Sequence, residues 1–130
     1  MQNINRFIEH TILKPDASEL DVMKKVEEAI DYSFLGVCVP PFWVKKVARE
    51  IENQNIQLVT VIGFPFGYNL TETKLEEMKM AVEHGANELD IVINISAFKS
   101  ALPWVKIELA KCAQFAHENN CLIKAIIETS

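Results

Sequence analysis

Two kinds of hydrophobic pattern alternate along the chain. Short runs of apolar, largely β-branched residues are typical of buried strands, and they occupy residues 35–39, 57–62, 88–94 and 122–127. Between them lie longer segments with apolar residues at helical spacing, which begin near Ser18, Pro41, Thr71 and Ser100. Ser18 and Thr71 are the expected N-terminal caps of two of these helices. A short helix over 5–8 and a strand over 9–13 are expected at the N-terminus.

This alternation predicts how the strands pair. Strands joined by helical connections of this length pair in parallel through right-handed crossovers. The expected fold class is therefore α/β, with about five parallel strands in sequential order, four crossover helices and the short N-terminal helix.

The few polar residues within the strands indicate which kind of sheet this is. Side chains alternate between the two faces of a strand, so each strand is expected to have one wholly apolar face. The opposite face carries Cys38, Thr60, Asp90 and Lys124. A flat sheet with helices on both faces has no good place for a mid-strand Asp and Lys, whereas the lumen of a TIM (β/α) barrel accepts converging polar groups. The pattern therefore favours a partial TIM barrel.

Asp90 and Lys124 are the charged residues of this face. They are expected on neighbouring strands and pointing the same way, where an ion pair would offset the cost of burying either charge alone. Such a pair has two interpretations of equal weight. It either fixes the register of the strands, or it belongs to an active site in which the carboxylate carries protons and the lysine tunes it, binds an anion or forms a Schiff base.

Composition and charge exclude several classes of protein. The 130 residues are 49% hydrophobic and 24% charged, which is globular composition. A complete eight-stranded barrel typically needs about 250 residues, so this length fits only part of one. No apolar run approaches the roughly 18 residues of a membrane helix. A net charge of −5 argues against a nucleic-acid partner.

The cysteines and the N-terminus indicate the compartment. Cys38, Cys112 and Cys121 are odd in number and scattered, and the first ten residues contain no apolar core of a signal peptide. A reduced, cytoplasmic chain is therefore expected. Cys38 is interpreted as a small buried hydrophobe in preference to a nucleophile.

Several motifs, in this order and at this spacing, together carry a resemblance to a known family. They are His10-Thr11-Ile12-Leu13-Lys14-Pro15, Val37-Cys38-Val39-Pro40-Pro41, Val61-Ile62-Gly63-Phe64-Pro65-Phe66-Gly67, Thr71-Glu72-Thr73-Lys74, residues 85–94 and Lys124-Ala125-Ile126-Ile127-Glu128-Thr129. Over residues 7–129 the chain resembles deoxyribose-phosphate aldolase, a class I aldolase and lyase. The resemblance implies reversible cleavage of 2-deoxyribose 5-phosphate to glyceraldehyde 3-phosphate and acetaldehyde through a lysine Schiff base, without a metal or other cofactor.

The same resemblance implies roles for particular residues. Asp90 matches the acidic residue that relays protons, and Lys124 matches a lysine that lines the site without being the nucleophile. Cys38 matches a cysteine near the pocket that the chemistry does not require. Glu9 stands where the family usually has Asp, and Thr60 is a further candidate for contacting substrate because of its expected face.

The family's Schiff-base lysine lies in a Lys-Thr-Ser-Thr-Gly motif on the sixth strand, and neither this motif nor the later phosphate-binding strands occur in these 130 residues. The leading hypothesis is therefore a single domain, residues 1–130, that forms the N-terminal part of an aldolase barrel and has little or no activity alone.

Two other hypotheses remain open. The chain could be a non-catalytic module whose open sheet edges pair with another copy, as a homo-oligomer, or with a complementing fragment. It could instead be an open flavodoxin-like sheet that binds a phosphate compound at the strand ends. The order of the strands distinguishes the last hypothesis, because only a barrel keeps them strictly sequential.

Overall fold

The computed structural model describes residues 9–93, 99–100 and 103–126. In it, five parallel strands form one sheet. The strands are β1 (Glu9–Thr11), β2 (Gly36–Val39), β3 (Gln57–Ile62), β4 (Glu88–Val92) and β5 (Leu122–Ile126), and their order in the sheet is β1-β2-β3-β4-β5. This sequential order confirms the partial TIM barrel and excludes a flavodoxin-like reversal. The expected helix over 5–8 lies outside the described residues.

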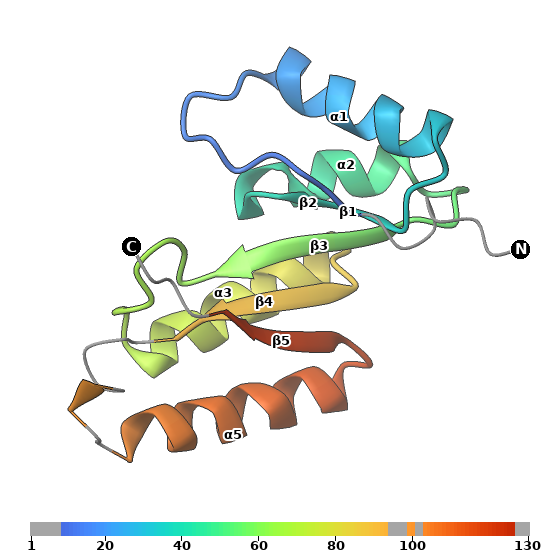
Figure 1. Ribbon diagram of the computed structural model, residues 1–130. Helices are drawn as coiled ribbons and strands as arrows, with labels where there is room; N and C mark the ends of the chain where they lie inside the picture. The colour runs from blue at the N-terminus through green and yellow to red at the C-terminus, as the bar shows by residue number, and fades with distance from the viewer. Residues whose placement is uncertain (1–8, 94–98, 101–102, 127–130) are drawn as a thin grey trace, which may run out of the picture.

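Each crossover between strands contains a helix, as predicted. The helices are α1 (Glu19–Asp31), the 3₁₀ turn η2 (Pro41–Trp43) continued by α2 (Val44–Glu50), α3 (Thr71–His84) and α5 (Trp104–Glu118). All of them lie on one side of the curved sheet, and the other side faces away from the helices (Figure 1). This one-sided arrangement is that of an outer helical layer around part of a barrel.

Helix α1 begins as the sequence predicts, whereas α3 does not. The Ser18 hydroxyl accepts a hydrogen bond from the Asp21 amide, and the Asp21 carboxylate accepts one from the Ser18 amide, which is a complete capping box. Thr71 is the first residue of α3 and not its cap, which is Leu70. The Thr71 hydroxyl instead donates to Glu108 of α5 at 2.8 Å. The prediction of a Thr71 cap was therefore wrong, because a tertiary partner takes the hydroxyl.

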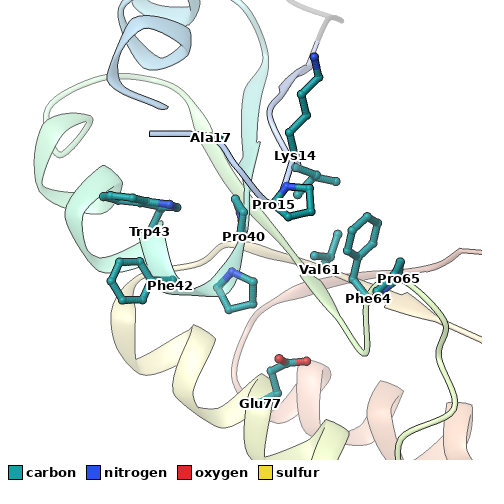
Figure 2. A pocket seen from close by; sticks show the side chains of 12 residues that line it. Lys14, Pro15, Ala17, Pro40, Phe42, Trp43, Val61, Phe64, Pro65 and Glu77 are labelled. Atoms are coloured by element: carbon teal, nitrogen blue, oxygen red, sulfur yellow. The ribbon is translucent and has the colours of Figure 1, made fainter. Parts of the chain in front are cut away.

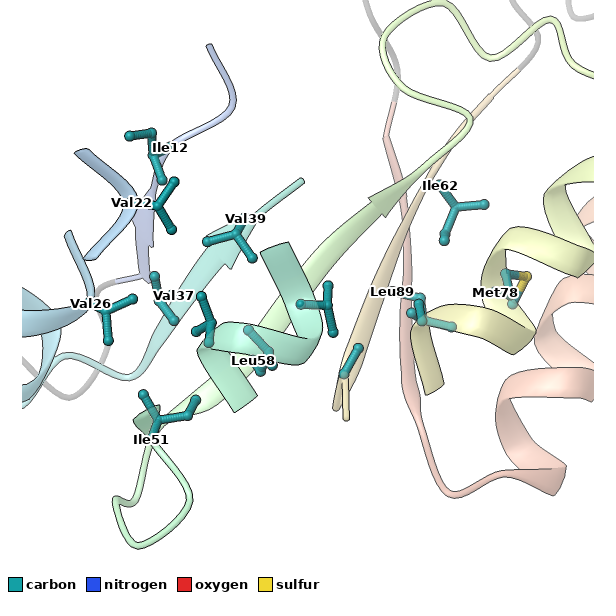
Figure 3. Close-up of a cluster of buried hydrophobic side chains, with 14 of the residues drawn as sticks. Ile12, Val22, Val26, Val37, Val39, Ile51, Leu58, Ile62, Met78 and Leu89 are labelled. Atoms are coloured by element: carbon teal, nitrogen blue, oxygen red, sulfur yellow. The ribbon is translucent and has the colours of Figure 1, made fainter. Parts of the chain in front are cut away.

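The main core lies between the helices and the sheet (Figure 3). Its strand residues include Val37, Val39, Leu58, Ile62, Leu89 and Ile91. Its helix residues include Val22, Val26, Val44, Val47, Met78, Ala81, Cys112 and Ala116. Nearly all are inaccessible to solvent, so burial of this layer is the principal stabilising term of the fold.

The opposite face of the sheet, here called the lumen face, has its own smaller apolar cluster. Cys38, Val59 and Val61 are buried there, with Leu13 and Ile126 packed against them. The register explains the grouping, because Cys38 pairs with Val59, and Val61 pairs with Asp90. Cys38 and Asp90 therefore lie on the lumen face, as the alternation of side chains predicted.

Thr60 lies on the other face, and its predicted place in the lumen was wrong. Its register partners are Val39 and Leu89, both in the layer against the helices. Its hydroxyl donates to the carbonyl of Val39 at 2.7 Å and is fully buried. A threonine that satisfies its hydroxyl on the neighbouring strand can sit in an apolar layer, so its polarity did not mark the lumen. The substrate contact predicted for Thr60 loses its basis.

The capping box gives the stability of the chain a specific dependence on pH. Hydrogen bonds from the backbone and side chain of Ser18 lower the pKa of Asp21. A lowered carboxyl pKa adds stability above the unfolded-state value of about 4, and this stability is lost as the pH falls through the folded-state pKa. The difference in urea midpoint between wild type and Asp21→Asn should therefore be present at pH 7 and shrink as the pH falls below about 4. A difference that stays constant with pH would contradict this role.

Candidate active site

The charged residues of the lumen face come from two neighbouring strands. Strands β4 and β5 pair in parallel, with Asp90 opposite Lys124 and Glu88 opposite Leu122. Residues 88 and 90 point to the same face because strand side chains alternate. This confirms the prediction that Asp90 and Lys124 lie side by side, and it places a second carboxylate, Glu88, on the same face.

Glu88 forms an ion pair with Lys124. The Lys124 Nζ atom lies 3.3 Å from Glu88 Oε2, and the Glu88 side chain is almost fully buried while that of Lys124 is 57% exposed. Oδ1 of Asp90 is also shielded from solvent. The site thus holds one buried carboxylate, one partly buried carboxylate and a neighbouring ammonium.

Sequence reasoning singled out Asp90 and passed over Glu88, although the alternation of the strand contained the signal. Glu88 shares the parity of Asp90 within an otherwise apolar strand. A charged residue at such a position needs a partner in the fold, and Lys124 is that partner.

Two other predicted residues lie elsewhere in the sheet. Cys38 belongs to the apolar cluster of the lumen face, two strands away from Asp90. Glu9 lies in β1 opposite Gly36, and its side chain lies outside what the structure describes. The structure thus brings Asp90 and Lys124 together and keeps the remaining predicted residues apart from them.

A cavity of about 550 Å³ opens at the carboxyl ends of the first three strands. Its walls come from the loop after β1, from residues 40–43 after β2, and from Phe64 and Pro65 after β3. Phe42 and Trp43 lie on one side, Phe64 and Pro65 on the other, and Glu77 of α3 below (Figure 2). In (β/α) barrels the substrate binds at this end of the strands. The cavity is therefore on the same end of the sheet as the expected active site.

A buried ion pair that sequence reasoning missed lies next to this end of the sheet. Lys74 of α3 is fully buried, and its Nζ atom donates to Glu108 Oε2 of α5 at 2.8 Å. Both residues fall on the buried stripes of their helices, with Met78 and Ala81 on one and Val105 and Cys112 on the other. That spacing was the available signal for a buried, paired charge.

This ion pair also affects a neighbouring thiol. Burial, with the nearby Glu108 charge as a second cause, raises the pKa of Cys112 to about 11. Burial likewise raises the pKa of the Cys121 thiol, with Glu88 adding to the shift. Thiols with raised pKa are poor nucleophiles, so neither residue is a candidate for covalent catalysis.

The described ranges also bear on metal binding and on membrane insertion. Within these ranges, no three His, Cys, Asp or Glu side chains are arranged to hold a metal ion. Nor is any helix of this part of the chain both long and apolar enough to cross a membrane.

Fold and site together define the class of protein. Sequential parallel strands, helices on one face and charged side chains on the other are the features of a TIM-barrel enzyme, of which this chain contains five strands. No protein-family model matches the chain.

Comparison with known proteins finds a consistent set of relatives. The chain is 42% identical to the deoxyribose-phosphate aldolase of Treponema denticola over 127 residues, which are 97% of this chain and 59% of that protein. It is 45% identical to the Lactococcus lactis enzyme of the same name, covering 98% of this chain and 57% of that protein.

Solved structures agree with the sequence matches. An aldolase named QR15 superposes with a TM-score of 0.90 at 35% identity, over 99% of this chain and 57% of that one. The tetrameric deoxyribose phosphate aldolase from Aeropyrum pernix gives a TM-score of 0.85 at 33% identity, over 94% and 51% of the two chains. The chain is thus homologous to deoxyribose-phosphate aldolases and spans somewhat more than half the length of these curated relatives.

Proposed function

We propose that this chain, residues 1–130, forms as a single domain the first five strands of a deoxyribose-phosphate aldolase barrel. It supplies Asp90 and Lys124 for the cleavage of 2-deoxyribose 5-phosphate. The observation that carries the proposal is the register of β4 and β5, which puts these two residues side by side on the lumen face. The Schiff-base lysine then comes from strands outside these 130 residues, since no Lys-Thr-Ser-Thr-Gly segment occurs among them.

The proposed chemistry assigns the proton transfers to Asp90. A lysine amine condenses with the aldehyde carbon of the open-chain sugar phosphate and releases water, giving an iminium ion. The 3-hydroxyl loses its proton as the C2–C3 bond breaks, and the bonding electrons pass into the iminium to form an enamine. Glyceraldehyde 3-phosphate leaves, C2 takes up a proton, and water releases acetaldehyde. Asp90, shielded from solvent beside an ammonium, can accept and return these protons.

Lys124 has a supporting role in this scheme. Its ammonium is paired with the buried Glu88 carboxylate, and this pairing competes with use of the lysine as an amine nucleophile. In the assembled site it would counterbalance the two carboxylates and attract the anionic substrate. Cys38 and Glu9 remain candidates for contacts with substrate.

Borohydride trapping with acetaldehyde tests these assignments. We expect no stable adduct on the 130-residue chain alone, because its lumen lysine is engaged in the ion pair with Glu88. When the chain is mixed with the C-terminal part of the Lactococcus lactis enzyme, we expect the adduct on that second polypeptide. Mass spectrometry locates the modified lysine, and an adduct on Lys124 that accompanies turnover would overturn the assignment.

The open edge of the sheet favours assembly as part of this function. Among the described residues β5 is the last strand of the sheet, and Leu122 is exposed. An unpaired edge of this kind is a site for strand addition. We propose that a sixth strand pairs with β5 in the functional assembly, in the cytoplasm, where the thiols stay reduced. Pairing between two copies of this chain, as a non-catalytic module, is the second candidate, and a sedimentation experiment on the pure chain distinguishes a self-associated species from a monomer.

A further inference from the structure

Lys74 joins three segments that are far apart in the sequence. Its ammonium has three N–H groups, and three acceptors surround it. They are the Gly67 carbonyl in the loop after β3 at 2.6 Å, the Val92 carbonyl at the end of β4 at 3.0 Å, and Glu108 Oε2 of α5 at 2.8 Å. One buried cation therefore connects the β3–α3 loop, the end of β4 and helix α5.

The loop that Lys74 holds, residues 63–67, is closed tightly on itself and on α3. The Gly67 amide donates to the Gly63 carbonyl at 2.7 Å, and the Gly63 amide donates to Glu77 Oε1 at 2.7 Å. Both glycines have positive φ angles, and a Cβ atom on Gly67 would lie 2.7 Å from the carbonyl oxygen of Val92. The loop thus lies directly against the end of β4, with Glu77 tethering one end and Lys74 the other.

Each segment that Lys74 connects carries part of the candidate site. The loop contributes Phe64 and Pro65 to the wall of the 550 Å³ cavity. Strand β4 carries Asp90, two residues before the carbonyl that accepts from Lys74. The ammonium therefore controls the distance between a wall of the cavity and the strand of the proton-relay carboxylate.

Stability alone is a weak explanation for a buried ion pair at this place. Apolar residues of similar volume often replace such a pair without loss of stability. They cannot, however, bind the two backbone carbonyls that converge on the ammonium. Lys74, unlike an apolar side chain, can therefore hold two backbone segments together.

We propose that Lys74, held in place by Glu108, is a positioning residue of the active site. It fixes the 63–67 loop against the carboxyl end of β4, so that the cavity wall and the strand of Asp90 keep one arrangement. The consequence for catalysis rests on the function proposed above, whereas the effect on the loop does not.

The test uses the double variant Lys74→Met/Glu108→Leu, which removes both charges and keeps the volume of the side chains. We expect it to fold with a melting temperature close to that of wild type. Hydrogen exchange of the Gly67 amide should become about tenfold faster or more, since the carbonyls of the loop and of β4 lose their common donor. Exchange of the Leu58 amide, bound by Asn87 Oδ1 at the other end of β3, should stay within about twofold of wild type.

A matched control removes another lysine–glutamate pair. Lys46 and Glu19 form an ion pair at 2.8 Å between α2 and α1, with both side chains well exposed. The variant Lys46→Met/Glu19→Leu should leave Gly67 exchange unchanged. Unchanged Gly67 exchange in a well-folded Lys74→Met/Glu108→Leu variant would overturn the proposal.

A second measurement separates this inference from the proposed function. In the mixture with the C-terminal part of the Lactococcus lactis enzyme, the double variant should lower kcat about tenfold, because the strand of Asp90 and the cavity wall lose their fixed arrangement, whereas Lys46→Met/Glu19→Leu should leave kcat unchanged. An unchanged kcat would overturn the catalytic part of the inference. If wild type itself shows no turnover in the mixture, the proposed function fails, and Gly67 exchange still decides whether Lys74 positions the loop.

Discussion

Replacing Lys74 by methionine alone is expected to lower the free energy of unfolding by about 3–5 kcal/mol, which is the usual effect of breaking a buried ion pair from one side. The substitution leaves the Glu108 carboxylate buried without its ammonium, although the Thr71 hydroxyl still donates to its Oε1 atom. It also takes the donor away from the carbonyls of Gly67 and Val92. Urea unfolding followed by circular dichroism measures the change.

Two further variants serve as controls in the same unfolding experiment. Adding Glu108→Leu to Lys74→Met should restore most of the lost stability, because no charge is then left buried without its partner. Lys46→Met, at an exposed ion pair, should cost no more than about 1 kcal/mol. If Lys74→Met and Lys46→Met were equally mild, the buried pair would not be coupled as the structure indicates.

Asp90→Asn is expected to lower kcat about 10²–10⁴-fold in the completed barrel, the range typical for loss of a general acid–base group. The amide keeps the shape of the side chain and cannot carry the proton between the 3-hydroxyl and C2. KM should change little, because the substitution removes a group that acts in the transition state. Steady-state assays of acetaldehyde release measure both constants.

Glu88→Gln is the control for this substitution. It removes the carboxylate charge from the Glu88–Lys124 ion pair and leaves Asp90 in place. If the proton transfers belong to Asp90, Glu88→Gln should impair kcat much less than Asp90→Asn does. A larger loss of kcat with Glu88→Gln than with Asp90→Asn would show that Glu88, and not Asp90, carries the protons.

The sequence alone predicted that the strands pair in parallel and that Asp90 lies beside Lys124. Strand alternation has a period of two, so a charge in an otherwise apolar strand indicates its face, and the crossovers predict parallel pairing. The sequential order was favoured by the polar lumen face, and only the structure excluded a flavodoxin-like order. Thr60 shows where this reasoning stops. Alternation groups Thr60 correctly with Leu58 and Ile62, and the register then places this group against the helices. Only the register reveals that the hydroxyl is satisfied by Val39.

The buried pair of Lys74 and Glu108 shows a second limit. Each residue lies on the buried stripe of its own helix, which the spacing of α3 and α5 contains. Which charges meet, however, depends on how α3 and α5 pack, and the two residues are 34 positions apart. The sequence also cannot show that the carbonyls of Gly67 and Val92 both accept from Lys74, because every residue has the same backbone acceptor.

The release of acetaldehyde from 2-deoxyribose 5-phosphate shows whether this chain supplies Asp90 to an active site that other strands complete. It should be measured for the 130-residue chain, for the C-terminal part of the Lactococcus lactis enzyme, and for an equimolar mixture of the two. Turnover is expected in the mixture alone, and it should be lost when the mixture contains Asp90→Asn. Equal turnover by the 130-residue chain alone, or turnover in the mixture that Asp90→Asn leaves unchanged, would contradict the claim that this chain supplies Asp90 to an active site completed by other strands.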